Sequence, residues 1–232
     1  MNHTLDHIPE GAPAARVAAP AVRDAHRGPV TAPTVLVFRE KLAYNRLRRI
    51  IDIVGALIML AVAAPILLVS SIAILIEDGR PILFRQRRVG RFGRLFTIYK
   101  LRTMRKEKCV DSLSPTTGRD ARITRVGYWL RRSSIDELPQ LINILRGEMA
   151  FVGPRPEMPF VVREYEAWQH LRHLVTPGVT GFWQTTCRST VPLHLPQATM
   201  LDLDYIQRAS HSTDAAVLVK TIRSLISAEG AY

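Results

Sequence analysis

The chain has 232 residues and a formal net charge of +12 at pH 7, a balance that suits nucleic acid, anionic lipid or phosphorylated substrates as partners. Arginine supplies most of the 32 basic residues, and its planar guanidinium binds phosphate oxygens in a bidentate fork. The two cysteines, Cys109 and Cys187, stand far apart and lack neighbours at metal-ligand spacing. This spacing implies no disulfide framework and fits a reducing cytoplasmic compartment.

Three regions differ in composition. Residues 1–40 are rich in proline and alanine and show little apolar periodicity, which is typical of a disordered tail. Residues 41–78 are mostly apolar and form the predicted membrane element. Residues 79–232 make up the rest of the chain, about 150 residues, which is enough for one domain with its own core.

The apolar element contains no charged side chain over residues 53–76. As one helix these residues would be about 36 Å long, enough to cross a hydrocarbon core of about 30 Å. Basic residues crowd both ends, and such residues hold a membrane flank in the cytoplasm. They are Arg39, Lys41, Arg46, Arg48 and Arg49 before the segment, and Arg80, Arg85, Arg87, Arg88, Arg91 and Arg94 after it.

Pro65 stands in the middle of this segment. A proline there removes a helical hydrogen bond and favours a sharp bend. With basic residues on both flanks, the pattern favours a helix that enters the membrane, breaks near Pro65 and leaves by the same face. A straight signal anchor is the main alternative. A buried core helix rarely runs so far without a charge, and a secretory signal peptide would be shorter and nearer the N-terminus.

Two short strands are predicted next, at 82–87 and 95–101. The two glycines in the intervening turn predict that these strands form a β-hairpin. Residues 108–120 have the proline and glycine content of a loop.

A helix is predicted over 123–130, where apolar residues recur at helical spacing among arginines. Such a helix would either lie on an anionic membrane surface or pack on the core with its arginines in water. The next helix, over 138–149, has two candidate starts. A capping box of Ser134 with Glu137 would place Pro139 beyond the first turn, whereas a cap at Asp136 would keep that proline inside it.

The remaining elements are a turn, a helix, a loop and a final helix. The turn covers 153–156, where two prolines flank one arginine. A helix is predicted around 160–174 and a loop over 176–181. Apolar spacing then predicts a final amphipathic helix over 213–228. The whole is an α+β fold, mainly helical, with amphipathic helices at the membrane interface.

The candidate chemistry centres on two adjacent carboxylates, Asp136 and Glu137. Side chains of this type at a helix start would hold a divalent cation and offer an oxygen nucleophile. Arg131 and Arg132 precede them, and these arginines and the positive helix end would attract phosphate. The alternative is that the acidic residues only cap the helix and complement its dipole.

Other cations would extend this site. Arg155 is the arginine held between two prolines, and a fixed backbone would preorganise its guanidinium for phosphate. Lys100 and Arg102, at the end of the predicted hairpin, would add positive charge, or would be ordinary solvated residues. No Walker loop and no dinucleotide-binding glycine fingerprint occurs.

Four segments together resemble the bacterial sugar transferase family, the monotopic polyprenyl-phosphate phosphoglycosyl transferases. The resemblance covers about residues 45 to 228 and is most specific between Asp136 and Pro156. Many family members have a serine before the membrane proline, where this chain has Ala64. The segments are Lys100-Leu-Arg-Thr-Met104, Asp136-Glu137-Leu-Pro-Gln-Leu-Ile-Asn143, Gly147-Glu-Met-Ala-Phe-Val-Gly-Pro-Arg155-Pro156 and Thr176-Pro-Gly-Val-Thr-Gly181.

The resemblance implies specific roles for several residues. Asp136 would be the nucleophile, and Asp136 and Glu137 would share a Mg²⁺ ion. Asp202 would be the family's downstream aspartate, although the nearby Asp204 is a second candidate. The membrane segment would be a re-entrant helix-break-helix with its break at Pro65. The predicted phosphate- and substrate-binding residues are Lys100, Arg102, Arg131, Arg155 and Asp202.

By the same resemblance, the enzyme would transfer a phosphosugar from a UDP-sugar to undecaprenyl phosphate through a covalent aspartyl intermediate, releasing UMP. It would act on the cytoplasmic face of the bacterial inner membrane, in the first membrane step of exopolysaccharide or other glycoconjugate synthesis. Inner-membrane lipids are expected partners and nucleic acid is not; a homodimer stays open. The sugar and the polyprenol length are not predicted. The rival hypotheses are a basic anchored domain that binds nucleic acid or anionic lipid, and a single-span scaffold.

Overall fold

The computed structural model describes residues 42–105, 120–187 and 192–227. Its elements are mainly helices, with two small sheets. The predicted tail and most of the predicted loop over 108–120 lie outside the described residues. The predicted α+β class, in its coarse form of a long apolar helix joined to a small mixed domain, is confirmed.

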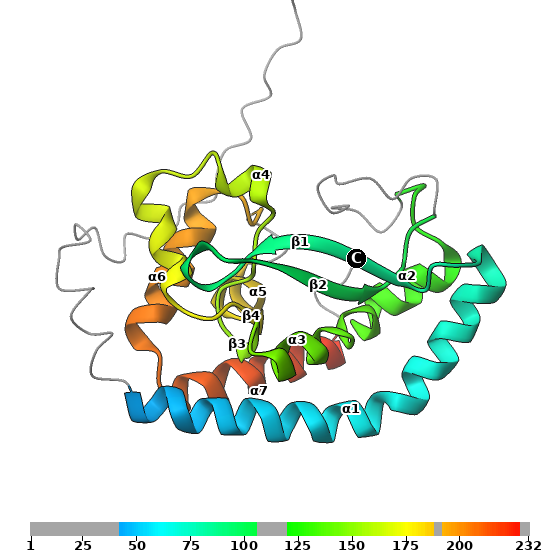
Figure 1. The fold of residues 1–232 in the computed structure, drawn as a ribbon, viewed down its shortest axis with the longest axis horizontal. Helices are drawn as coiled ribbons and strands as arrows, with labels where there is room; N and C mark the ends of the chain where they lie inside the picture. The colour runs from blue at the N-terminus through cyan, green and yellow to red at the C-terminus, as the bar shows by residue number, and fades with distance from the viewer. Residues whose placement is uncertain (1–41, 106–119, 188–191, 228–232) are drawn as a thin grey trace, which may run out of the picture.

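The long helix α1 spans Leu42–Asp78 and lies along one edge of the molecule (Figure 1). It is assigned as one helix of 37 residues with Pro65 inside it. Figure 1 shows the helix bending toward its C-terminal part. The helix is long and apolar enough to cross a membrane, and only 17% of its most apolar window is buried by the rest of the chain.

Both ends of α1 are tied to the same domain. Near the N-terminal end, Arg48 donates to the carbonyl oxygen of Val152, and Asp52 Oδ1 accepts a hydrogen bond of 3.1 Å from the Phe151 amide. At the other end, Glu77 accepts hydrogen bonds of 2.7 and 2.8 Å from the amides of residues 125 and 126, at the start of α2 (Arg125–Arg132). The side of α1 between these ties that faces away from the domain exposes many aliphatic side chains.

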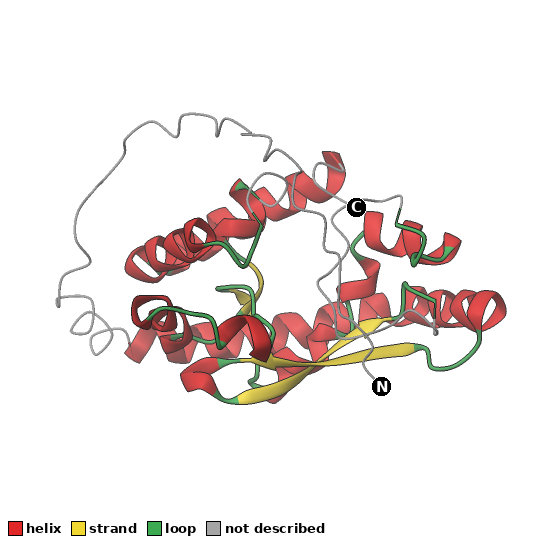
Figure 2. Cartoon of the chain, turned by 90° about the horizontal axis from the view of Figure 1, so that it is seen from above, coloured by secondary structure: helices red, strands yellow, loops and turns green. Residues whose placement is uncertain are grey.

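The predicted hairpin is confirmed. Strand β1 (Leu83–Val89) pairs antiparallel with β2 (Leu95–Leu101), with Leu83 opposite Leu101 and Val89 opposite Leu95. The hairpin lies along one side of the molecule in the view from above (Figure 2). Its inner side chains join α1 and α3 (Gln140–Arg146) in a core cluster that includes Ala56, Phe96, Ile98, Leu141, Ile144 and Met149.

A second, parallel sheet was not predicted. Strand β3 (Ala150–Val152) pairs with β4 (Gly178–Thr180), so the predicted loop over 176–181 contains a strand. The turn-rich segment after β3 therefore lies beside a chain segment that is distant in sequence. Because Gly153 and Gly178 have no side chain, the two backbones approach each other closely: a Cβ at Gly153 would lie 2.6 Å from the Thr176 oxygen.

The predicted helix over 160–174 forms two shorter elements, α4 (Pro159–Val162) and the 3₁₀ helix η5 (Ala167–Leu174). The division has a local cause, because Glu166 has extended backbone angles and forms a capping box with Gln169 that starts a new helix. The helices α5 (Phe182–Thr186) and α6 (Pro196–Arg208) were not predicted.

The final predicted helix is observed as α7 (His211–Ser227). Helices α6 and α7 pack with β3 in a second core cluster of Val152, Leu203, Tyr205, Ile206, Ala209 and Val217. Asp214 on α7 also accepts hydrogen bonds from the hydroxyl groups of Tyr44 and Tyr205, at 2.7 and 2.8 Å. These contacts add a further attachment of the N-terminal part of α1 to the domain.

Candidate active site

Asp136 and Glu137 lie in a short 3₁₀ turn, η4 (Ile135–Glu137), between α2 and α3. Both predicted caps are wrong: Ser134 is left-handed with φ 56° and makes no side-chain cap, and Pro139, not Asp136, precedes α3 as its N-cap residue. The left-handed Ser134 directly precedes the 3₁₀ turn, and Asp136 is the buried residue of that turn. Asp136 is 7% exposed.

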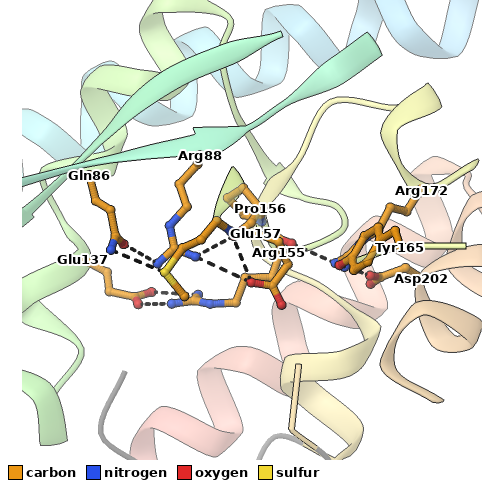
Figure 3. Close-up of polar contacts among 10 residues, drawn as sticks. Gln86, Arg88, Glu137, Arg155, Pro156, Glu157, Tyr165, Arg172 and Asp202 are labelled. Carbon is orange, nitrogen blue, oxygen red and sulfur yellow. Dashed lines mark hydrogen bonds and ion pairs between the residues drawn. The ribbon is translucent and has the colours of Figure 1, made fainter. Parts of the chain in front are cut away.

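Glu137 binds two cations that come from distant parts of the chain. Lys100 Nζ lies 2.7 Å from Glu137 Oε1, and Arg155 Nη2 also lies 2.7 Å from that oxygen. Figure 3 shows the Arg155 guanidinium facing the Glu137 carboxylate. All three side chains keep between 15% and 18% of their surface exposed, so a ligand can reach this ion-pair cluster.

Burial and the neighbouring charges together set the pKa of the Asp136 carboxyl. Burial has the largest effect and raises this pKa to about 6, and the negative charge of Glu137 adds to the rise. The positive charges of Lys100, Arg131 and Arg155 act in the opposite direction and lower it. Burial also lowers the pKa of Lys100 and of Arg131. Two carboxylates thus share their surroundings with three cations, an arrangement suited to a phosphate-bearing substrate.

The main chain around Arg155 is held by hydrogen bonds at successive carbonyl groups. The Arg155 oxygen accepts from Arg172 Nη2 at 2.8 Å, and the Pro156 oxygen accepts from Arg88 Nη1 at 3.1 Å. The flanking carbonyls of Pro154 and Glu157 accept from the amides of residues 178 and 89, both at 2.9 Å. The loop that carries Arg155 is therefore fixed on several sides.

Two predicted site residues lie outside this cluster. Arg102 is 3% exposed, and its Nη2 contacts Asp78 Oδ2 at 2.9 Å and the carbonyl oxygens of Asp78 and Gly79 at 2.8 and 2.9 Å, at the end of α1. Asp202 on α6 is 1% exposed and pairs with Arg172 at 2.5 Å. The structure thus brings together Lys100, Arg131, Asp136, Glu137 and Arg155.

The second candidate aspartate, Asp204, has a different environment from Asp202. Its carboxylate pairs with Arg208 one helical turn later, at 2.7 Å, and both side chains are exposed. Asp202 and Arg172, by contrast, form an ion pair in which each side chain is only 1% exposed.

Sequence reasoning did not single out Arg88, Glu157 or Arg172. Arg88 is 7% exposed and lies 3.8 Å from Glu157 Oε2. Arg172 stands between two histidines in a polar helix, and neither the spacing nor the composition distinguishes it from an exposed arginine. Glu157, however, directly follows the Pro-Arg-Pro turn, and its position beside that motif was a usable signal.

The donor set of the site fits a magnesium ion that is bound together with a phosphate ligand. Among the residues that the structure describes, no group of three or more His, Cys, Asp or Glu side chains could hold a metal. Asp136 and Glu137 do supply adjacent carboxylates, and Mg²⁺ binds through one or two carboxylates plus water and substrate phosphates. These two residues would hold the ion.

Known proteins match most of this chain. The family model described as bacterial sugar transferase matches residues 43–228. A UDP-glucose:undecaprenyl-phosphate glucose-1-phosphate transferase of Caulobacter vibrioides is 39% identical over 203 residues, covering 83% of this chain and 74% of the relative. An undecaprenyl-phosphate glucose phosphotransferase of Komagataeibacter xylinus is 36% identical, covering 86% of this chain and 40% of that protein.

A third relative differs in the sugar that its name gives. The UDP-N-acetylgalactosamine-undecaprenyl-phosphate N-acetylgalactosaminephosphotransferase of Aeromonas hydrophila is 33% identical over 192 residues, covering 81% of this chain and 45% of the relative. The chain therefore spans less than half the length of two of these three relatives. Similarity of this degree extends across proteins named for different sugars.

Proposed function

Because the chain belongs to the bacterial sugar transferase family and is a phosphoglycosyl transferase, we propose that it transfers a sugar 1-phosphate from a UDP-sugar to undecaprenyl phosphate and releases UMP. Relatives named for this transfer support the acceptor. The observation that carries the proposal is the buried Asp136 carboxylate beside the cluster of Lys100, Glu137 and Arg155.

Asp136 is the proposed nucleophile. An Asp136 oxygen forms a bond to the β-phosphorus of the donor, the bond from that phosphorus to the bridging oxygen breaks, and UMP leaves with the electron pair. A phosphate oxygen of the lipid acceptor then attacks the same phosphorus and displaces the Asp136 carboxylate. Each step forms one phosphorus–oxygen bond and breaks another, so the reaction needs no oxidant or reductant.

The surrounding cations supply the electrostatic part of the mechanism. Lys100, Arg131 and Arg155 lie close enough to Asp136 to lower its pKa. Cations held there would stabilise the negative charge of the donor diphosphate during phosphoryl transfer. Asp136 and Glu137 would hold Mg²⁺, which when bound would offset part of the diphosphate charge. Glu137 keeps two of the cations in place through its ion pairs.

We further propose that α1 is a re-entrant membrane helix and that the domain lies on the cytoplasmic face of the inner membrane. A straight span would put the two ends of α1 on opposite faces of a bilayer about 30 Å thick. Polar contacts of Asp52 and Glu77 instead tie both ends to one domain. Exposed apolar side chains of α7 and Trp129 on α2 would meet the membrane surface.

The direct test is the covalent intermediate. Purified protein is incubated with Mg²⁺ and UDP-glucose, UDP-galactose or UDP-N-acetylgalactosamine, without any lipid acceptor. We expect at most one UMP per enzyme and a phosphosugar adduct on the peptide that contains Asp136, seen by mass spectrometry. Adding undecaprenyl phosphate should discharge the adduct and restore repeated turnover.

Two variants make this test specific. Asp136→Asn should release no UMP and form no adduct, whereas Asp204→Asn, which changes an exposed aspartate on α6, should behave as the unchanged protein. Full turnover by Asp136→Asn would defeat the proposed mechanism. Repeated UMP release that requires the acceptor from the first turnover would also oppose it, because a two-step reaction does not need the acceptor to begin.

A further inference from the structure

Arg172 is a buried arginine of η5 whose guanidinium contacts three other parts of the chain. It is 2% exposed. Nη2 donates to the main-chain oxygen of Arg155 at 2.8 Å and lies 2.5 Å from Asp202 Oδ2, and Nη1 donates to the Tyr165 hydroxyl at 2.5 Å. Figure 3 shows this group on the side of Arg155 that faces away from Glu137.

We propose that Arg172 is a positioning residue of the transfer reaction, which holds the main chain of Arg155 so that the Arg155 guanidinium stays against Glu137. This inference rests on the function proposed above. Arg172 contacts the backbone of Arg155, not its guanidinium, so its effect on substrate is transmitted through the position of that residue. The reach of an arginine side chain is set by its own backbone, and a shift of about 1 Å can reduce an enzymatic rate about 100-fold.

A second buried arginine acts on the next carbonyl group. Arg88 Nη1 donates to the Pro156 oxygen at 3.1 Å, and Arg88 Nη2 donates to Gln86 Oε1 at 2.6 Å. Arg88 belongs to β1, whereas Arg172 belongs to η5. Two successive carbonyl groups are therefore held by cations from two separate elements, which restricts rotation of the peptide that joins Arg155 to Pro156.

Asp202 has a defined place in this arrangement. Both Asp202 and Arg172 have side chains that are 1% exposed, so the carboxylate balances a buried positive charge that would otherwise be unfavourable. Its ion pair with Arg172 connects it to the Arg155 loop. The phosphate-binding role expected for Asp202 is therefore replaced in our proposal by a supporting one, in which the carboxylate orients the arginine that holds the loop.

The test is a double-mutant cycle between Arg172→Lys and Arg155→Met. Lysine keeps a positive charge beside Asp202, but its ammonium group lacks the planar fork that contacts three acceptors together. UMP release is measured in a single turnover with whichever of the three UDP-sugars gives the fastest reaction. We expect Arg172→Lys to lower this rate about 10- to 100-fold, with a thermal midpoint close to that of the unchanged protein.

The second half of the cycle identifies the route of the effect. If Arg172 acts through Arg155, Arg172→Lys should cause no further loss in a protein that already carries Arg155→Met. An equal loss in both backgrounds would overturn the inference, and so would an unchanged rate for Arg172→Lys alone. Arg208→Lys is the matched control, because this exposed arginine pairs with Asp204 and should leave the rate unchanged.

A second pair of substitutions keeps the test decisive if Arg172→Lys does not fold. Arg172→Met is then combined with Asp202→Leu, which removes both buried charges together, and the cycle with Arg155→Met is repeated with the same expected non-additivity. The two proposals fail differently. Wild-type protein without a phosphosugar adduct contradicts the proposed function and the inference with it, whereas an adduct with additive losses contradicts the positioning role alone.

Discussion

Lys100 Nζ and Glu137 Oε1 lie 2.7 Å apart, although the two residues are 37 positions apart in the chain. The contact joins the end of β2 to the 3₁₀ turn that carries Asp136. Glu137 therefore holds cations of the site, in addition to its proposed role as a ligand of a metal ion. Lys100 is also the charge that most strongly opposes the rise in the pKa of Asp136 caused by burial.

The first prediction follows from this charge. Burial raises the pKa of Asp136 to about 6. In the proposed mechanism the carboxylate must be ionised to attack phosphorus, so kcat/KM should fall as the pH drops through about 6. Lys100→Met removes the largest opposing charge and should move this acid limb to higher pH. The measurement is the pH profile of UMP release at fixed Mg²⁺ concentration.

Lys100→Arg is the control for that profile, because it retains the positive charge. Its acid limb should stay close to that of the unchanged enzyme, whatever happens to the maximal rate. An acid limb at the same pH in Lys100→Met and Lys100→Arg would show that Lys100 does not set the ionisation of Asp136.

The second prediction concerns stability instead of activity. A carboxyl group whose pKa is raised in the folded state from 3.8 to about 6 destabilises the fold when ionised, by up to about 3 kcal/mol above pH 6. This penalty disappears as the pH falls through 6 toward 4, where the folded and unfolded groups are both protonated. Asp136→Asn should therefore be more stable than the unchanged protein at pH 7.5 without Mg²⁺.

Thermal midpoints measured between pH 4.5 and 8 in the presence of a chelator check this expectation. The increase in thermal midpoint caused by Asp136→Asn should become smaller as the pH is lowered. Asp204→Asn changes an exposed aspartate and should show no such trend. A less stable Asp136→Asn at pH 7.5 would mean that the Asp136 carboxylate contributes favourable contacts that exceed the effect of its burial.

The parts of the fold that sequence reasoning identified are governed by local patterns. The hairpin was predictable because a turn with two glycines separates two short strand-like runs. The Asp136–Glu137 turn and the Arg155 loop were found because rigid or charged residues lie next to one another in the chain. The exact start of α3 was not found, since Pro139 leaves more than one capping arrangement open.

Other parts depend on partners that are distant in the chain. Strands β3 and β4 have three residues each, too few for a recognisable alternation, and their parallel pairing joins segments about 28 residues apart. The burial of Arg172 is likewise decided by Asp202 on another helix. Such features follow from tertiary packing, and the local sequence carries no separate signal for them.

The third prediction concerns the bend of α1. Pro65→Ala supplies the missing amide donor and removes the ring that opposes a straight helix, so it should favour a straight span. Single cysteines placed before Leu42 and after Asp78, in a background without the native cysteines, would report the location of the two ends. We expect both to react from the cytoplasmic side in the unchanged helix, and one to become protected in Pro65→Ala, with loss of UMP release.

Ala64→Ser is the control, because it changes the neighbouring residue without altering the backbone donors. Its labelling pattern and activity should stay unchanged. If Pro65→Ala keeps both ends on one side and remains fully active, the polar contacts at the ends of α1 are sufficient for its topology, and Pro65 is not required.

The last prediction separates two roles for Arg102, which sequence reasoning placed among the phosphate-binding residues. Its guanidinium joins β2 to the end of α1 through Asp78 and Gly79. Arg102→Met should lower the free energy of unfolding by about 3 to 5 kcal/mol, because it breaks a buried ion pair. The KM for the UDP-sugar should change little in the protein that remains folded. Arg155→Met should show the opposite pattern, with a small change in stability and a large loss of transfer rate. Denaturant titration and steady-state kinetics of both variants decide between these roles. A raised KM in Arg102→Met with an unchanged free energy of unfolding would instead support a phosphate-binding role for Arg102.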